Sequence, residues 1–181
     1  MKNKKRVCKA FFAWADKKEE DWLNEMSLRG WHFQSYFFFF YVFIRGDSKE
    51  YVYKLDYNMG LTGNERDNYI SLFEDSGWDY LCQFAGWYYF RTEKVGQELP
   101  DIYSDNHSKA AKYRRLLKFL SAIFILEIVI SVTVVFNPLH PETAANSLLM
   151  KGLYGFILIL IGYACYRINK RIHALERNEE K

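Results

Sequence analysis

The segment Arg29-Gly30-Trp31-His32-Phe33 decides the fold, because its pattern returns at Ser76-Gly77-Trp78-Asp79-Tyr80. Each Gly-Trp pair follows a segment with helical periodicity and precedes an aromatic-rich segment with the alternation of a strand. Glycine enters the left-handed conformation that ends many helices without a Cβ clash, so both glycines are predicted helix stops. Each tryptophan is then expected to fold back over the last helical turn.

The residues around the first Gly-Trp pair predict one strand, one helix and two further strands. Residues 4–14 predict the first strand. Asp16 and Glu19 have the spacing of a capping box, which predicts the helix start. After Gly30 the aromatic pattern predicts strands at Trp31–Phe37 and Phe39–Arg45.

The second half repeats this order. Glu50–Tyr57 predicts a strand, Asn64 is the expected N-cap of a helix, and further strands are expected at Trp78–Gln83 and Trp87–Thr92. The halves align without gaps, so that Tyr41 matches Tyr88 and Phe43 matches Phe90. We therefore expect an α+β fold, in which a duplicated β-α-β-β unit forms one antiparallel sheet of about six strands with two helices packed on it.

Composition limits the classes of function. Of the 181 residues, 50% are hydrophobic and 19% aromatic, which signals either large packed sheets or an aromatic-lined cavity. A net charge of +3 is too small to argue for nucleic acid as a partner. The three cysteines, Cys8, Cys82 and Cys165, are far apart, which argues against a disulfide framework or a zinc site.

Two apolar runs, Leu116–Phe136 and Leu148–Tyr166, follow a polar linker. Each is long enough to cross a hydrocarbon core of about 30 Å. A soluble helical hairpin is the alternative, but two consecutive runs with so little polar content favour a transmembrane hairpin. The loop between them, Asn137–Ser147, contains Pro138 and Pro141.

Basic residues lie near the start of the first apolar run and after the end of the second. The positive-inside rule therefore places both chain termini in the cytoplasm. The stretch Lys109–Lys118 is also expected to be attracted to anionic lipid. The predicted parts are a cytoplasmic duplicated domain at 1–93, a polar linker with a basic juxtamembrane segment at 94–115, a transmembrane hairpin at 116–166 and a cytoplasmic tail at 167–181. The flanking residues are Lys109, Lys112, Arg114, Arg115 and Lys118 around the start of the first run, and Arg167, Lys170 and Arg171 after the second.

The chain resembles a bacterial family known as domain of unknown function 2812, over roughly Lys4–Asp105. The resemblance implies no established activity and no catalytic residues, but family members commonly carry hydrophobic segments after this domain. It also implies a signalling or membrane-response setting, because some members are associated with transcription regulators of the PadR type. Together with the two apolar runs, the resemblance to a bacterial family leads us to expect a multi-pass protein of the bacterial inner membrane. It rests on Trp22-Leu23-Asn24-Glu25-Met26, Gly30-Trp31, Glu50 to Tyr57, Tyr69, Gly77-Trp78, Tyr89-Phe90-Arg91 and Ile102-Tyr103-Ser104-Asp105.

The aromatic strands raise the question of what covers their second face. The run Tyr36–Ile44 is apolar on both faces of a strand, and an uncovered face would form a large exposed patch. Three interpretations stay open: the sheet buries its own second face or pairs with another copy, it forms a ligand cavity, or it contacts a membrane surface. A cavity for an apolar cation would take its stacking contacts from Tyr53, Tyr57, Trp87 and Tyr89.

The two apolar runs contain one carboxylate, Glu127, near the middle of the first run. Such a group is costly in a bilayer and normally faces a partner or a cavity. Lys151 is expected to reach the surface or to pair with Glu127, and Gly155 with Gly162 would form a small-residue groove for helix packing.

Signals of catalysis are poor. The four histidines are scattered without metal-ligand spacing, and Asp56 and Asp79 are expected only to aid solubility. We predict no catalytic residue, no metal and no cofactor. The leading hypothesis is a membrane-anchored, non-enzymatic sensing or binding protein that recognises a partner protein or an apolar small molecule. The alternative is a structural or assembly subunit that forms homo-oligomers through its hairpin.

Overall fold

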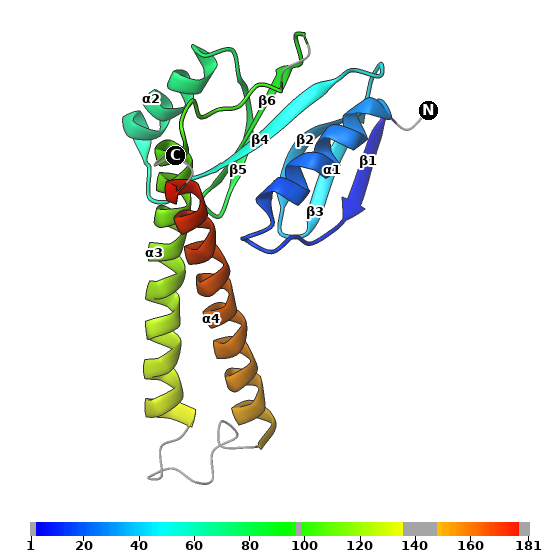
Figure 1. Cartoon of the computed structure of the whole chain (residues 1–181). Coiled ribbons are helices and arrows are strands. Elements are labelled where there is room, and N and C mark those ends of the chain that lie inside the picture. Colours follow the sequence, from blue (N-terminus) through cyan, green and yellow to red (C-terminus); the bar gives the residue numbers. More distant parts are fainter. Residues whose placement is uncertain (1–2, 97–98, 136–147, 178–181) are drawn as a thin grey trace. The chain divides into compact units, whose positions relative to one another are not determined.

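The computed structural model describes residues 3–96, 99–135 and 148–177 (Figure 1). The chain divides into two compact units, Met1–Ser108 and Lys109–Lys181, a boundary that lies within the predicted linker. The elements are β1 (Lys4–Cys8), α1 (Asp16–Leu28), β2 (Trp31–Phe37), β3 (Phe40–Arg45), β4 (Tyr51–Tyr57), α2 (Gly63–Glu74), β5 (Asp79–Phe84), β6 (Trp87–Glu93), α3 (Asn106–Ile130), the π-helical η1 (Ser131–Val135) and α4 (Leu148–Arg177).

The described strands of the N-terminal unit form two three-stranded antiparallel sheets. The first sheet has the order β1-β3-β2, and the second has the order β4-β6-β5. The prediction of one continuous sheet of about six strands is therefore wrong. The physical reason lies at β4, where the backbone N–H groups of Tyr53 and Leu55 donate to the side chains of Asn24 (2.8 Å) and Glu20 (3.0 Å) on α1. Helix α1 thus occupies the edge that a further strand would need.

The two sheets share details of strand pairing. The pairing of β2 with β3 shifts between Phe33 and Ser35, and that of β5 with β6 shifts between Tyr80 and Cys82. The turns that follow contain Phe38 and Ala85, both with positive φ, at 51° and 49°. Each feature of the first sheet lies 47 residues before its counterpart, as in Phe33 and Tyr80.

The predicted helix starts are wrong in detail. Helix α1 has Ala15 as its N-cap and α2 has Thr62, and among the described residues neither helix start has a side-chain cap hydrogen bond. Asp16 is the first residue of α1, and Glu19 accepts hydrogen bonds from tyrosines instead of completing a capping box. The first strand is also shorter than the predicted 4–14, because it ends at Cys8.

The predicted helix stops are confirmed. Gly30 and Gly77 have φ values of 74° and 84°, in the left-handed region. Their N–H groups donate to the carbonyl oxygens of Ser27 (2.8 Å) and Glu74 (2.9 Å), and Trp78 N–H donates to Phe73 (3.0 Å). The Gly-Trp pairs therefore set the point at which each helix turns into its strand.

The two sheets differ in how their faces are covered. One face of the second sheet packs with α2 in a cluster of Val52, Phe73, Trp78, Tyr88 and Phe90. Its other face joins a second cluster with α1 and the first sheet, so both faces are filled. Helix α1 lies along one face of the first sheet (Figure 1), and the members of this shared cluster are Leu23, Met26, Phe33, Tyr41, Phe43, Tyr53, Leu55 and Tyr89.

The C-terminal unit contains two long apolar helices. The most apolar 18-residue stretch has a mean hydropathy of 2.2 within Asn106–Thr133 and of 1.3 within Met150–Arg177, and each of these two ranges is 28 residues long. By length and composition both could cross a membrane. The predicted loop Asn137–Ser147 and Phe136, the end of the first predicted run, lie outside the described residues.

Replacing Gly30 by alanine should destabilise the domain more than replacing Gly77. Both substitutions force a side chain into left-handed backbone, which costs about 1 kcal/mol. A Cβ on Gly30 would also lie 2.7 Å from the carbonyl oxygen of Gly46, whereas a Cβ on Gly77 meets no described atom within 4 Å. Urea unfolding of the full chain in detergent, followed by tryptophan fluorescence, measures both. Equal losses would contradict the close approach at Gly30.

Candidate interaction surface and buried carboxylate networks

Four consecutive phenylalanines are exposed where β2 turns into β3. Phe37, Phe38, Phe39 and Phe40, the phenylalanine tip, are each between 51% and 65% exposed. The tip is an ordered cluster, because the rings of Phe37 and Phe38 lie 4.8 Å apart and each lies 5.5 Å from Phe84 of β5. The N–H of Lys9 donates to the carbonyl oxygen of Phe39 (2.9 Å). Such an apolar cluster in water is typical of an interaction site.

The backbone of the tip is unfavourable for a large residue. Phe38 has a φ of 51°, a region that bulky side chains rarely adopt. The corresponding turn of the second sheet uses Ala85 and Gly86, which fit this conformation at less cost. Backbone strain of this kind is concentrated at functional sites.

The tip continues into an open face of the first sheet. Along β3, Tyr41 and Phe43 are buried under α1, whereas Phe40 and Ile44 on the opposite side are exposed. Strand pairing places Cys8 beside Phe40, Arg6 beside Val42 and Lys4 beside Ile44. We call this surface the open face; it consists of Phe37, Phe40, Val42 and Ile44 with Lys4, Arg6 and Cys8 of β1.

A buried carboxyl group, Glu19, connects α1 to both sheets. Its Oε1 atom accepts hydrogen bonds from the hydroxyls of Tyr41 on β3 (2.7 Å) and Tyr89 on β6 (2.8 Å). Burial raises the pKa of Glu19 above its ordinary value, against the opposing effect of the two tyrosine hydrogen bonds. The same burial, together with the Glu19 charge, raises the pKa of Tyr41 and of Tyr89.

A second carboxyl group, Asp56 on β4, is fully buried. It accepts hydrogen bonds from the hydroxyls of Tyr69 on α2 and Tyr103, which lies three residues before α3. Ile102 packs on the α2 cluster, and Asp101 lies 4.0 Å from the Lys54 ammonium. The segment that leads into α3 is therefore attached to the core of the N-terminal unit.

The predicted role of Asp56 in solubility is wrong, because burial and two tyrosine donors make it a structural acceptor. Asp79 does lie at the surface, but it accepts a hydrogen bond from Arg91 at 2.9 Å. Nothing in the local sequence indicated the partners of Asp56, since Tyr103 is 47 residues away from it.

The structure places the four predicted ligand-binding aromatics on one face of the second sheet. Tyr53, Tyr57 and Tyr89 are buried there, and Trp87 is half-buried. The Tyr53 hydroxyl accepts a hydrogen bond from Phe33 N–H (3.2 Å), and the rings of Tyr57 and Trp87 lie 5.2 Å apart. Tyr53 and Tyr89 belong to the shared cluster and Trp87 packs against it, and the role of the four side chains in binding a ligand stays a prediction.

The hairpin residues are only partly brought together. Gly162 of α4 lies against Phe124 of α3, with 3.6 Å from its ideal Cβ position to the ring, whereas a Cβ on Gly155 would meet no described atom within 4 Å. Lys151 lies in the first turn of α4. The Glu127 Oε2 and Ser131 Oγ atoms are buried and have no hydrogen-bond partner among the described residues.

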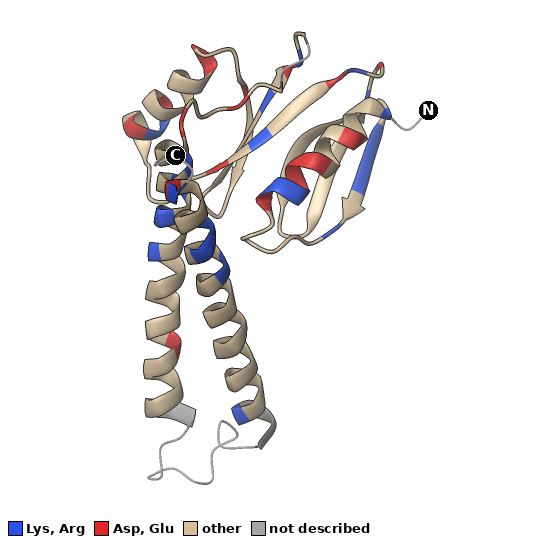
Figure 2. Cartoon of the chain, viewed as in Figure 1, with Lys and Arg blue, Asp and Glu red and all other residues tan. Residues whose placement is uncertain are grey.

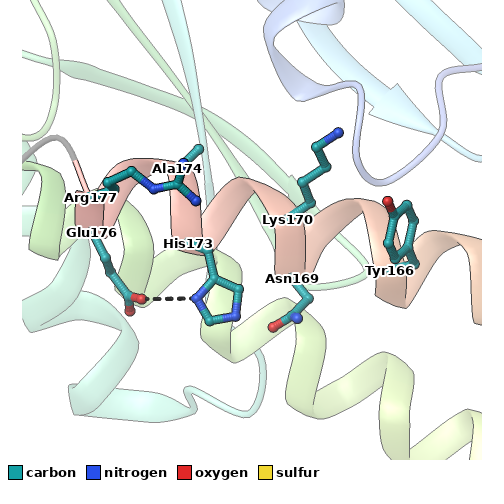
Figure 3. Close-up of a pocket in the computed structure, with 7 residues that line it drawn as sticks. All are labelled: Tyr166, Asn169, Lys170, His173, Ala174, Glu176 and Arg177. Carbon is teal, nitrogen blue, oxygen red and sulfur yellow. Dashed lines mark ion pairs between the residues drawn. The ribbon is translucent and has the colours of Figure 1, made fainter.

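A hollow of about 720 Å³ lies along the last turns of α4 (Figure 3). Its seven described lining residues all belong to this one helix, from Tyr166 to Arg177, and His173 Nδ1 lies 3.5 Å from Glu176 Oε2. The described lining therefore has the character of a helix surface with mixed charge, which does not suit an apolar ligand.

Replacing Glu19 by glutamine should remove part of the pH dependence of folding. Because the folded-state pKa of Glu19 is raised, its contribution to stability is complete below the unfolded value of 4.5 and is lost as pH rises through the folded pKa. Glutamine keeps an oxygen acceptor for Tyr41 and Tyr89 without the charge. Urea unfolding of both proteins from acidic to neutral pH should show the variant gaining relative stability as pH rises.

The matched control is Tyr41→Phe, which leaves Glu19 with one tyrosine donor fewer and should cost about 1–3 kcal/mol. If Glu19→Gln and the parent lose stability in parallel over this pH range, Glu19 is not the buried group described above.

A family model described as "Protein of unknown function (DUF2812)" matches residues 15–125. The match begins at the start of α1, later than the predicted resemblance, and extends through the Asp56–Tyr103 contact into α3. No curated protein and no solved structure was found that matches the chain. Since the matched residues make up more than half of the 181-residue chain, this protein belongs to the DUF2812 family.

Proposed function

We propose that this protein is a membrane-anchored, non-enzymatic sensing or binding protein of the bacterial inner membrane. Its aromatic-rich N-terminal domain recognises an apolar partner on the cytoplasmic side, either a partner protein or an apolar small molecule. The observation that carries the proposal is the contrast between the two sheets. Both faces of the second sheet are filled, whereas the first sheet presents the open face and the phenylalanine tip to solvent.

A duplicated β-α-β-β unit accounts for this contrast. The shared strand order, the shared shifts in pairing and the positive φ at Phe38 and Ala85 all support the duplication. Within one chain, the helix of the first β-α-β-β unit packs on the second face of the other unit's sheet. One face of the first sheet is then left without a covering helix among the described elements. The open face is that remaining surface, and its apolar side chains are available to a partner.

The attachment of Tyr103 to Asp56 supports a sensing role. Asp101, Ile102 and Tyr103 all contact the second sheet or α2, and α3 begins at Asn106. A partner that shifts the N-terminal domain would therefore pull on the first residues of α3. This gives a physical route by which recognition reaches the hairpin.

The proposed topology places both termini in the cytoplasm. Lys and Arg gather near the start of α3 and the end of α4 (Figure 2), which are the hairpin's outer ends in sequence. The positive-inside rule assigns such ends to the cytoplasm. The N-terminal domain then lies in a compartment that keeps Cys8 and Cys82 reduced, in agreement with their free thiols.

The second candidate function is an assembly subunit that forms homo-oligomers through its hairpin. It is favoured by the buried Glu127 Oε2 and Ser131 Oγ atoms, which have no hydrogen-bond partner among the described residues. In a bilayer such groups gain from a polar contact on a neighbouring helix. Here Glu127→Gln should change the oligomer size in detergent.

A photo-crosslinking amino acid at Ile44 of the open face tests the proposed recognition of a protein in intact cells. We expect one adduct of defined mass from Ile44 and none from Leu72, an exposed apolar residue on α2. The small-molecule version predicts a saturable change in tryptophan fluorescence when the full chain in nanodiscs is titrated with tetraphenylphosphonium. If neither a specific adduct nor a saturable change appears, the proposed function is wrong.

A further inference from the structure

The open face and the phenylalanine tip combine an apolar row with a cationic row. On β3 and the end of β2 the side chains are Phe37, Phe40, Val42 and Ile44, while Lys4 and Arg6 project from the neighbouring β1 on the same side. The two strands are about 5 Å apart, so cations run alongside the apolar side chains. Both cations are exposed and form no ion pair among the described residues.

This pattern matches the interface of an anionic bilayer. Phenylalanine side chains enter the boundary between headgroups and acyl chains, and lysine or arginine beside them attracts anionic headgroups. The tip adds Phe38 and Phe39 at the end of the hairpin, where aromatic rings can enter the lipid without burying a strand edge. Its strained Phe38 is understandable if the ring is selected for lipid contact and not for the turn.

The chain also keeps the domain close to the membrane. Tyr103 is bound to the buried Asp56, α3 begins at Asn106, and the apolar run begins at Leu116. The helical segment from Asn106 to Leu116 spans about 15 Å at 1.5 Å per residue. A tether of this length gives a high effective concentration of lipid at the domain, so a weak surface contact suffices.

Charge argues against a second copy as the occupant. Two open faces stacked on each other would enclose Lys4 and Arg6 of both copies in one apolar interface, and burying cations without partners is costly. An anionic lipid surface supplies the complementary charge that a second copy of this face lacks.

We infer that the phenylalanine tip and the open face dock into the anionic interface of the bilayer that the hairpin enters. The inference goes beyond the proposed function, because it gives the open face and the phenylalanine tip a lipid contact in addition to the proposed protein or small-molecule partner.

The test places a nitroxide spin label on the full chain at Phe38→Cys, with Leu72→Cys as the matched exposed control. Cys8 and Cys165 are replaced by serine and alanine, while Cys82 is left in place because burial raises the pKa of its thiol to about 12 and keeps it unreactive. The labelled proteins are reconstituted in nanodiscs of phosphatidylglycerol with phosphatidylcholine, and in nanodiscs of phosphatidylcholine alone. Relaxation by oxygen and by a water-soluble nickel chelate then reports the depth of each label.

In anionic nanodiscs we expect the Phe38 label to be at least several-fold more accessible to oxygen, relative to nickel, than the Leu72 label. Lys4→Glu with Arg6→Glu should return the Phe38 label toward the value of the control. Phe38→Asn relieves the left-handed strain and so preserves folding. When the spin label is placed at residue 39 instead, Phe38→Asn should also reduce the depth of the label in the bilayer. This variant therefore separates loss of lipid contact from loss of structure.

Equal nickel accessibility of the Phe38 and Leu72 labels in both kinds of nanodisc overturns the inference. An unchanged depth after reversal of Lys4 and Arg6 overturns its electrostatic part. Protection of the Phe38 label in detergent, with dipolar broadening between labels, shows that a second copy covers the face and also overturns it. The proposed recognition of an apolar partner stands if a second copy covers the face. It also stands if the photo-crosslinking amino acid at Ile44 still forms an adduct with a protein.

Discussion

The fold depends on the hydrogen bonds between α1 and the edge of β4. Glu20 and Asn24 accept the N–H groups of Leu55 and Tyr53, which an edge strand would otherwise present to a neighbouring strand. Because these acceptors are side chains of a helix, the second sheet ends at β4 with its edge satisfied. The helix is thereby fixed between the two sheets, and the chain forms two three-stranded sheets.

The placement of α1 determines which surfaces remain for recognition. One side of the helix packs on the first sheet and another on the second, so the aromatic side chains of both sheets share one core. Glu19 adds tyrosine hydrogen bonds from β3 and β6 to the same helix. Among the described elements no helix covers the far side of the first sheet, and its phenylalanines are exposed next to Lys4 and Arg6 of β1, which form no ion pair with a described residue. The interaction surface is thus a consequence of how the core is filled.

Local features of the fold were predictable because they depend on near neighbours in sequence. Gly30 and Gly77 mark helix ends through their own backbone freedom, and alternating aromatics locate the strands within a few residues. The Asp16–Glu19 spacing misled, since a capping box and a buried acceptor have the same local pattern and only distant tyrosines decide between them. The role of Asp56 was also predicted wrongly, because its donor Tyr103 lies far from it in the sequence. The aromatic run after Tyr36 showed that two apolar faces exist, but which of them is open depends on where α1 packs.

Hydrogen exchange of the full chain in nanodiscs tests most directly whether α1 closes the edge of β4. We expect the amides of Tyr53 and Leu55 to exchange within about tenfold of the rates in the central strand β6, although β4 is an edge strand. Exchange of these two amides as fast as that of the exposed Val95 would contradict this expectation. In that case α1 would not hold the two sheets together, and the origin of the open face would need another explanation.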